Sequence, residues 1–337
     1  MTPHLPTPQR TSIKAIAASP AGRAFIALVL VLAVGAIFHA DGAFYKIGTH
    51  RDALRQASVY GILACGLTLV IISGGIDLAV GSVLALVAVC CAKMSIHWGW
   101  SGWLVVPAGL LVGAASGSIA GLVTARLRVQ PFIATLALMV LARGAAKYVS
   151  GGMKVSTAVR NADGSYRYAE VPALFRAIDH RIFGDNLPVV AVIFMLCVAM
   201  AWLALSKHTW GRHLYAIGGN EEASRLSGVP VVAAKTWAYV ASGVFAAVAG
   251  LCQAAQEQQG DPETGGGYEL IAISMVVIGG TSLMGGRGGM GLTLLGVLTI
   301  GYLDKILSIN AVPEAGRLML TGIIIVAAVL TQRRSRT

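Results

Sequence analysis

Charged residues are scarce in this chain. They make up 12% of the 337 residues, whereas hydrophobic residues make up 56%. A soluble globular domain carries about 25% charged residues. This composition excludes a soluble globular protein and indicates an integral membrane protein in contact with a lipid bilayer. The net charge is +11, but the basic residues are scattered through loops and tails, without a basic stripe interleaved with aromatics. This pattern excludes a nucleic-acid partner and favours a membrane-surface role for the charge.

Catalytic and metal-binding motifs are also missing. The sequence contains no HExxH, no GxSxG and no His and carboxylate pair within one turn of a span. Its five cysteines lie in apolar runs and form no CxxC or Cys/His cluster, so they are expected to be small core residues. We therefore predict no catalytic residue, no metal site and no enzymatic activity. A Walker motif is absent as well, so any ATP chemistry belongs to another subunit.

The chain consists largely of long apolar segments. We expect an all-α polytopic transmembrane bundle of about ten spans, some short or broken, because a span needs about 20 apolar residues. The predicted domains are an N-terminal tail (residues 1–23), a single transmembrane domain (24–332) and a basic C-terminal tail (333–337). The expected spans are residues 24–40, 57–73, 83–92, 103–124, 131–149, 187–206, 236–256, 270–284, 290–307 and 316–332.

The orientation is not decided by the count of basic residues, which divide about evenly between the two sides. The basic C-terminal tail and the tight turn with Arg126 and Arg128 favour a cytoplasmic location for both termini. The polar segment 153–186 then becomes a periplasmic loop of about 34 residues, a length that suggests a function such as partner docking.

The longest predicted cytoplasmic connection, residues 207–235, has the signals of a short helix. Gly218 and Gly219 are expected to end the preceding structure, and Asn220 is a good N-cap. Glu221 and Glu222 fall in the first turn, where the helix dipole favours acids. Arg225 and Leu226 lie near the other end, before Gly228 and Pro230 stop the helix. Such a short helix between two spans is expected to dock on a partner. A solvated loop is the simpler alternative.

Residues 68–83 contain glycines and one acid inside an otherwise apolar run, a pattern typical of broken helices along a transport pathway. The acid, Asp77, has two interpretations of equal weight. It is either a pathway residue, since ionisable groups in membranes are commonly functional, or an N-cap for the helix that follows.

Other positions have a polar or a packing interpretation. Gln130 and Thr135, at the start of a span, offer groups that can meet sugar hydroxyls, although capping and interhelical hydrogen bonds are at least as good an account. Gly113, Gly117 and Gly121 recur every fourth residue and predict a flat stripe for close helix packing.

Three of these stretches, and a fourth further along the chain, resemble the ribose-type ABC transporter permease family. The residues are Gly219-Asn220-Glu221-x-Ala223-x-Arg225-Leu226-Ser227-Gly228, Gly75-Ile76-Asp77-Leu78-Ala79-Val80-Gly81, Gln130-x-Phe132-Ile133-Ala134-Thr135-Leu136, and the run from Val276 to Gly286 that contains Thr281 and Ser282. Ala79 stands where the family usually has Ser, so a hydroxyl there is not essential in this chain.

The resemblance implies the permease subunit of an importer that moves a monosaccharide across the inner membrane. The implied partners are a second copy of the chain, a cytoplasmic ATPase that carries ATP and Mg, and a periplasmic sugar-binding protein; the chain itself binds no cofactor. The coupling residues would be Gly218, Gly219, Asn220, Glu221, Glu222, Arg225 and Leu226, and the pathway residues Asp77, Gln130, Thr135, Thr281 and Ser282. Two alternatives stay open, a permease for nucleosides or another small polar solute and an ion-coupled secondary transporter.

Overall fold

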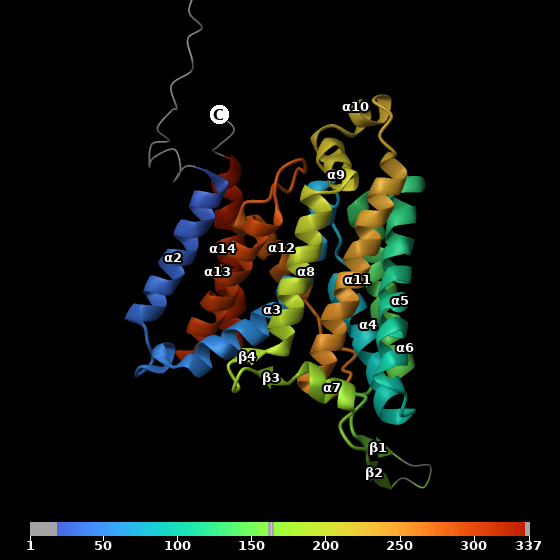
Figure 1. Cartoon of the computed structure of the whole chain (residues 1–337), viewed down its shortest axis with the longest axis vertical. Helices are drawn as coiled ribbons and strands as arrows, with labels where there is room; N and C mark the ends of the chain where they lie inside the picture. Colours follow the sequence, from blue (N-terminus) through green and yellow to red (C-terminus); the bar gives the residue numbers. More distant parts are fainter. Residues whose placement is uncertain (1–18, 161–162, 164, 334–337) are drawn as a thin grey trace, which may run out of the picture.

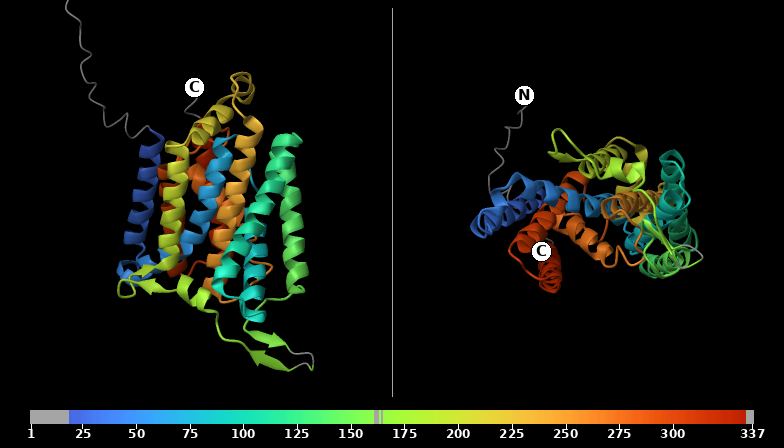
Figure 2. Two further views of the ribbon diagram at one scale, coloured as in Figure 1. Left: turned by 45° about the vertical axis from the view of Figure 1, so that its right-hand side comes forward. Right: turned by 90° about the horizontal axis from the view of Figure 1, so that it is seen from below.

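Helices α3 (Ile47–Ile72), α4 (Val80–Ala92) and α11 (Val231–Glu257) form the centre of the computed structural model, which describes residues 19–160, 163 and 165–333. They are the most deeply buried of the long apolar helices. Around them lie α2 (Pro20–Ile37), α5 (Gly102–Gly121), α6 (Pro131–Ser150), α8 (Val189–Ser206), α12 (Tyr268–Gly279), α13 (Met290–Ile309) and α14 (Glu314–Arg333) (Figure 1). Seen from below, α2, α13 and α14 lie at one end of the bundle and α5 and α6 at the other (Figure 2).

These ten helices correspond to the ten predicted spans. Within the described residues, eight of the helices are long and apolar enough to cross a membrane. Helix α12 has only 12 residues and is about 18 Å long, against a hydrocarbon core of about 30 Å. The prediction of an all-α polytopic bundle with short or broken spans is confirmed. The predicted N-terminal tail and the basic C-terminal tail lie outside the described residues, except for residues 19–23 and 333.

One predicted boundary is wrong by ten residues. Helix α3 begins at Ile47 and not near residue 57. Its first turns are polar and therefore give no hydropathy signal. Arg55 donates to Asp179 with an Nε to Oδ1 distance of 2.9 Å, and Asp52 accepts from Arg181 at 3.1 Å. These ion pairs join the first turns of α3 to the segment before α8.

Segment 153–186 has structure of its own at one end of the bundle (Figure 1). It contains the antiparallel hairpin of β1 (Ala158–Arg160) with β2 (Tyr166–Tyr168). It also contributes β3 (Arg181–Ile182), which pairs antiparallel with β4 (Leu187–Pro188) just after the segment. Between them lies α7 (Ala173–Ile178), which buries Phe175 against the ends of α4 and α11. The opposite end carries α9 (Thr209–Gly219) and α10 (Glu221–Leu226). These two ends face opposite sides of a membrane that the bundle crosses.

The glycine stripe of α5 lies directly against α11, and the two helices form the most extensive pair in the bundle. A methyl group added at Gly113 would lie 2.2 Å from the carbonyl oxygen of Gly243, and one at Gly117 would lie 2.2 Å from that of Tyr239. At Gly121 the nearest atom would be the Thr236 Cα at 2.8 Å. The two backbones therefore approach so closely that no side chain fits between them.

Candidate coupling site and broken-helix segment

Helix α10 is a capped helix of six residues at the tip of the connection between α8 and α11. The Asn220 side chain accepts a hydrogen bond from the backbone N–H of Ala223 at 2.9 Å. Glu222 and Arg225 form an exposed ion pair one turn apart, with Arg225 Nη2 2.5 Å from Glu222 Oε1. The hydrogen bond from Arg225 lowers the pKa of Glu222 below its ordinary value. The apolar Leu226 is 79% exposed, so the helix presents an apolar residue to whatever it meets.

Gly218 and Gly219 form the last turn of α9, and the helix ends at Gly219 as expected. The chain turns only at Asn220, whose extended backbone separates α9 from α10. Glycine fits at position 218 because the surrounding backbone leaves no room for a side chain. A methyl group there would lie 1.9 Å from the carbonyl oxygen of Ile72 and 2.4 Å from the backbone nitrogen of Gly286, whereas one at Gly219 would meet nothing within 4 Å.

Gly218 is thus the centre of a contact between three segments, which we call the glycine junction. The segments are Gly218 of α9, residues 72–74 at the end of α3, and Gly285 with Gly286 before α13. The Gly286 N–H donates to the Ile72 carbonyl at 2.9 Å. Gly285 and Gly286 have φ of +82° and +70°, a conformation that favours glycine. The hydroxyl of Tyr215 in α9 also donates to the Gly288 carbonyl at 3.0 Å. These contacts hold α9 directly against both other segments.

Glu221, the first residue of α10, is joined to the core by an ion pair with Lys235 in α11. The Lys235 Nζ lies 2.9 Å from Glu221 Oε2. The Lys235 side chain is 9% exposed, while that of Glu221 is 55% exposed. A nearly buried ammonium needs a partner, since an unpaired charge in such a place is costly. The pair therefore fixes the position of α10 relative to α11.

We expect Glu221→Lys to abolish transport while the protein stays in the membrane, because two cations then face each other at the start of α11. The combined exchange Glu221→Lys with Lys235→Glu is expected to restore at least part of the activity, because the pair is rebuilt with reversed sign. Solute uptake and the thermal unfolding midpoint are the measurements. Glu222→Lys serves as the control for stability, since an exposed ion pair contributes only about 0–1 kcal/mol. An inactive double exchange with normal stability would instead assign Glu221 to a direct contact with a partner.

Asp77 lies in the segment between α3 and α4 and is 3% exposed. Its Oδ1 accepts from the backbone N–H of Ala79 at 3.0 Å, and its Oδ2 accepts from the Ser242 hydroxyl of α11 at 2.8 Å. The neighbouring Ile76 carbonyl accepts from the hydroxyl of Tyr239 at 3.3 Å. Asp77 thus holds the broken segment against α11. The N-cap position itself belongs to Ala79, since α4 begins at Val80.

Replacing Asp77 by asparagine tests its two interpretations. A pathway role predicts that uptake falls more than stability. A holding role predicts normal uptake and a lower unfolding midpoint, because the carboxylate that accepts from Ser242 is exchanged for an amide N–H that can only donate to the hydroxyl. A hydrogen bond between these neutral groups is weaker than one to a carboxylate. Ser242→Ala is the matched variant, since it removes the same bond from the other side and leaves the carboxylate in place.

The other predicted pathway residues divide between two places. Thr135 is buried, and its hydroxyl donates to the Pro131 carbonyl at 2.9 Å and lies 3.4 Å from the Ile76 carbonyl, so it joins Asp77 at the broken segment. Gln130 is exposed just before α6. Thr281 and Ser282 lie in the loop before α13, near the glycine junction. The Thr281 hydroxyl is buried with no hydrogen-bond partner in the described part of the chain.

Sequence reasoning missed the residues of α11 that hold these segments. Lys235, Tyr239 and Ser242 are spaced four and three residues apart, which places them on one face of a helix. The spacing of these polar residues within an apolar run is the sequence pattern from which they could have been predicted. A second missed residue is Arg143 of α6, whose guanidinium donates to the carbonyls of Pro262 and Thr264. It holds the loop between α11 and α12, where Gly265 packs against Gly81 at the start of α4.

Comparison with known proteins decides the family. Residues 51–329 match the model of the branched-chain amino acid transport system permease component family. The chain belongs to this family. The permease is 38% identical over 309 residues to the ribose import permease protein RbsC of Haemophilus influenzae, a match that covers 91% of each chain.

Two relatives are named for other solutes. The L-arabinose transport system permease protein AraH of Escherichia coli is 37% identical over 276 residues, which cover 82% of this permease and 80% of AraH. The fructose import permease protein FrcC of Rhizobium meliloti is 33% identical over 319 residues, which cover 92% and 84%. No solved structure matches the permease.

Proposed function

We propose that this permease is the membrane subunit of an ATP-driven importer that takes up a monosaccharide. The supporting observation is the similarity along most of the chain to permeases named for ribose, L-arabinose and fructose. Ribose and L-arabinose are pentoses and fructose is a hexose, and all three are neutral monosaccharides. A solute of this class is therefore a better proposal than a nucleoside.

The proposed motor is a separate cytoplasmic ATPase that carries ATP and Mg, because this chain has no Walker motif. Helix α10 is the proposed docking element. It protrudes from one end of the bundle (Figure 1), it presents Leu226, and it is capped by Asn220. The ion pair of Glu221 with Lys235 ties it to the core, and the glycine junction lies behind it in the preceding helix. A rigid element of this kind suits the transmission of a push from a partner to the spans.

The remaining assembly follows from the same proposal. The ends of the chain and α10 lie on the cytoplasmic side of the inner membrane, and segment 153–186 lies on the periplasmic side, where a sugar-binding protein would dock. A second copy of the permease would complete the pathway. Sugar specificity need not reside in the permease, since the binding protein can select the sugar first.

Reconstitution tests the proposal. Proteoliposomes that contain the permease, its ATPase and the binding protein are expected to accumulate radiolabelled ribose, arabinose or fructose only when ATP is present. An ionophore that collapses ion gradients should leave this uptake intact. Uptake that survives without ATP but stops with the ionophore would refute ATP coupling and support an ion-coupled transporter. A panel with a nucleoside and L-leucine tests the solute class.

A further inference from the structure

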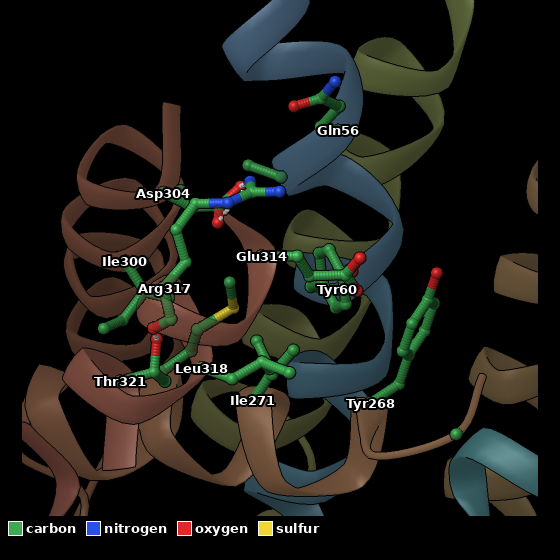
Figure 3. A pocket seen from close by; sticks show the side chains of 14 residues that line it. Gln56, Tyr60, Tyr268, Ile271, Ile300, Asp304, Glu314, Arg317, Leu318 and Thr321 are labelled. Atoms are coloured by element: carbon green, nitrogen blue, oxygen red, sulfur yellow. Dashed lines mark hydrogen bonds and ion pairs between the residues drawn. The ribbon is translucent and has the colours of Figure 1, made fainter. Parts of the chain in front are cut away.

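A cavity of about 190 Å³ lies between α3, α12, α13 and α14, on the side of the bundle away from α5 and α6. Two tyrosines form part of its wall, Tyr60 of α3 and Tyr268 at the start of α12, with ring centroids 4.5 Å apart. Ile271, Ile300 and Leu318 supply an apolar part of the wall (Figure 3). A third part is polar and contains Asp304 of α13 and Arg317 of α14.

The size of the cavity suits one sugar ring. An engineered apolar cavity of about 150 Å³ is known to hold benzene, which is a six-membered ring. A cavity of about 190 Å³ is thus large enough for a furanose or pyranose ring. Sugar rings also have C–H faces that pack against aromatic rings, and the Tyr60 and Tyr268 rings offer such surfaces.

The charges in the cavity disfavour an anionic solute. Arg317 and Asp304 are already paired, with Arg317 Nη1 2.9 Å from Asp304 Oδ1 and 3.1 Å from Oδ2. A solute carboxylate or phosphate would have to compete with Asp304 for the guanidinium and would meet Glu314 nearby. The side chains of Arg317 and Asp304 are 25% and 47% exposed. A hydroxyl, which can accept from the guanidinium and donate to the carboxylate, fits the polar wall without breaking the pair.

We propose that this cavity is a monosaccharide-binding site of the permease, in which the sugar ring packs on Tyr60 and Tyr268 and its hydroxyls bind Asp304 and Arg317. The inference rests on the proposed sugar import and deepens it, because it gives the permease its own contact with the solute. Gln56 is exposed at the edge of the cavity, and Thr321 contributes a further hydroxyl to the wall.

Protection of an engineered thiol tests binding directly, without ATP or partner proteins. Gln56→Cys and Thr321→Cys are introduced separately into the full-length permease in lipid nanodiscs and labelled with a small maleimide, with the unaltered permease as the blank. Ribose, arabinose or fructose is expected to slow labelling at both positions. Met153→Cys, an exposed position in the loop after α6, is the control and should react equally fast with or without sugar. Protection by L-leucine but not by sugars would overturn the proposal.

Uptake by the reconstituted transporter supplies a second measurement. Tyr268→Ala and Asp304→Asn are each expected to lower uptake at low sugar concentration about tenfold or more. The first removes the aromatic surface on which the sugar ring packs. The second removes a charged partner of a sugar hydroxyl, and a hydrogen bond to a charged group is among the stronger polar contacts. Tyr268→Phe, which keeps the ring, should retain more activity than Tyr268→Ala. Tyr148→Ala is the matched control, because Tyr148 is 89% exposed on α6 and should transport normally.

The two proposals fail in different ways. If the permease does not import sugars, the unaltered transporter shows no sugar uptake and sugars protect neither thiol. If it imports sugars but does not use this cavity, the unaltered transporter is active, the tyrosine and aspartate variants transport like it, and both thiols react at full speed in the presence of sugar.

Discussion

Replacing Gly218 by alanine is expected to abolish sugar uptake while the permease still reaches the membrane. The added methyl group would lie 1.9 Å from the Ile72 carbonyl oxygen and 2.4 Å from the Gly286 nitrogen. Both neighbours are backbone atoms and have no rotamer with which to move away. Helix α9 must therefore shift outward, which breaks its contacts with the end of α3 and with the loop before α13 and displaces α10, which follows α9 directly. We expect at least a tenfold loss of uptake.

Gly219→Ala is the matched control, because a methyl group there has nothing within 4 Å and the residue lies in the same helical turn. Uptake in proteoliposomes and ATP hydrolysis by the assembled transporter should be measured together. Continued hydrolysis without uptake would locate the defect in coupling. Normal uptake by Gly218→Ala would show that the glycine junction is not needed for transport.

Replacing Gly117 by alanine is expected to lower stability more than any change to the exposed face of α5. The new methyl group would lie 2.2 Å from the Tyr239 carbonyl oxygen and 2.8 Å from the Val240 Cα. The helices must separate, so packing is lost along the most extensive helix pair of the bundle. Overpacking of this kind typically costs about 1–3 kcal/mol, and the rigid backbone places this position at the upper end of that range.

Gly144→Ala is the control for this prediction, since Gly144 lies inside α6 with nothing within 4 Å of a methyl group. Alanine there should stabilise the helix by about 0.5–1 kcal/mol. The unfolding midpoint of each detergent-extracted protein, followed by gel filtration after heating, measures both effects. Equal midpoints for Gly117→Ala and the unaltered permease would mean that α5 and α11 are not held as tightly as the structure has them.

Local features of the fold could be predicted from the sequence. The ten spans follow from apolar length, and the cap at Asn220 follows from one side chain and its nearest backbone groups. The spacing of Gly113, Gly117 and Gly121 indicated close packing, although it did not name α11 as the partner. These features depend on residues within a few positions of one another, which is the range over which sequence patterns carry information.

Contacts between distant segments could not be predicted in this way. The glycine junction joins Ile72, Gly218 and Gly286, and the ion pair of Lys235 with Glu221 appears only when α10 folds back toward α11. The start of α3 was also missed, because Asp52 and Arg55 reduce its hydropathy and are matched by Arg181 and Asp179, more than 120 positions later. The cavity residues Tyr60, Tyr268 and Arg317 come from three segments and show no local signal.

Helix α11 acts as a lever in this arrangement. Its 27 residues make a rod about 40 Å long, and a tilt of about 5° about Ser242 moves Lys235 by about 1 Å and Glu257 by about 2 Å. One end is tied to α10 through Lys235, the middle holds the broken segment through Ser242 and Asp77, and the other end leads into the loop that packs Gly265 on Gly81. We therefore expect a displacement of α10 to produce a shift about twice as large at the other end of α11, where the chain leads through the Gly265 loop to Tyr268.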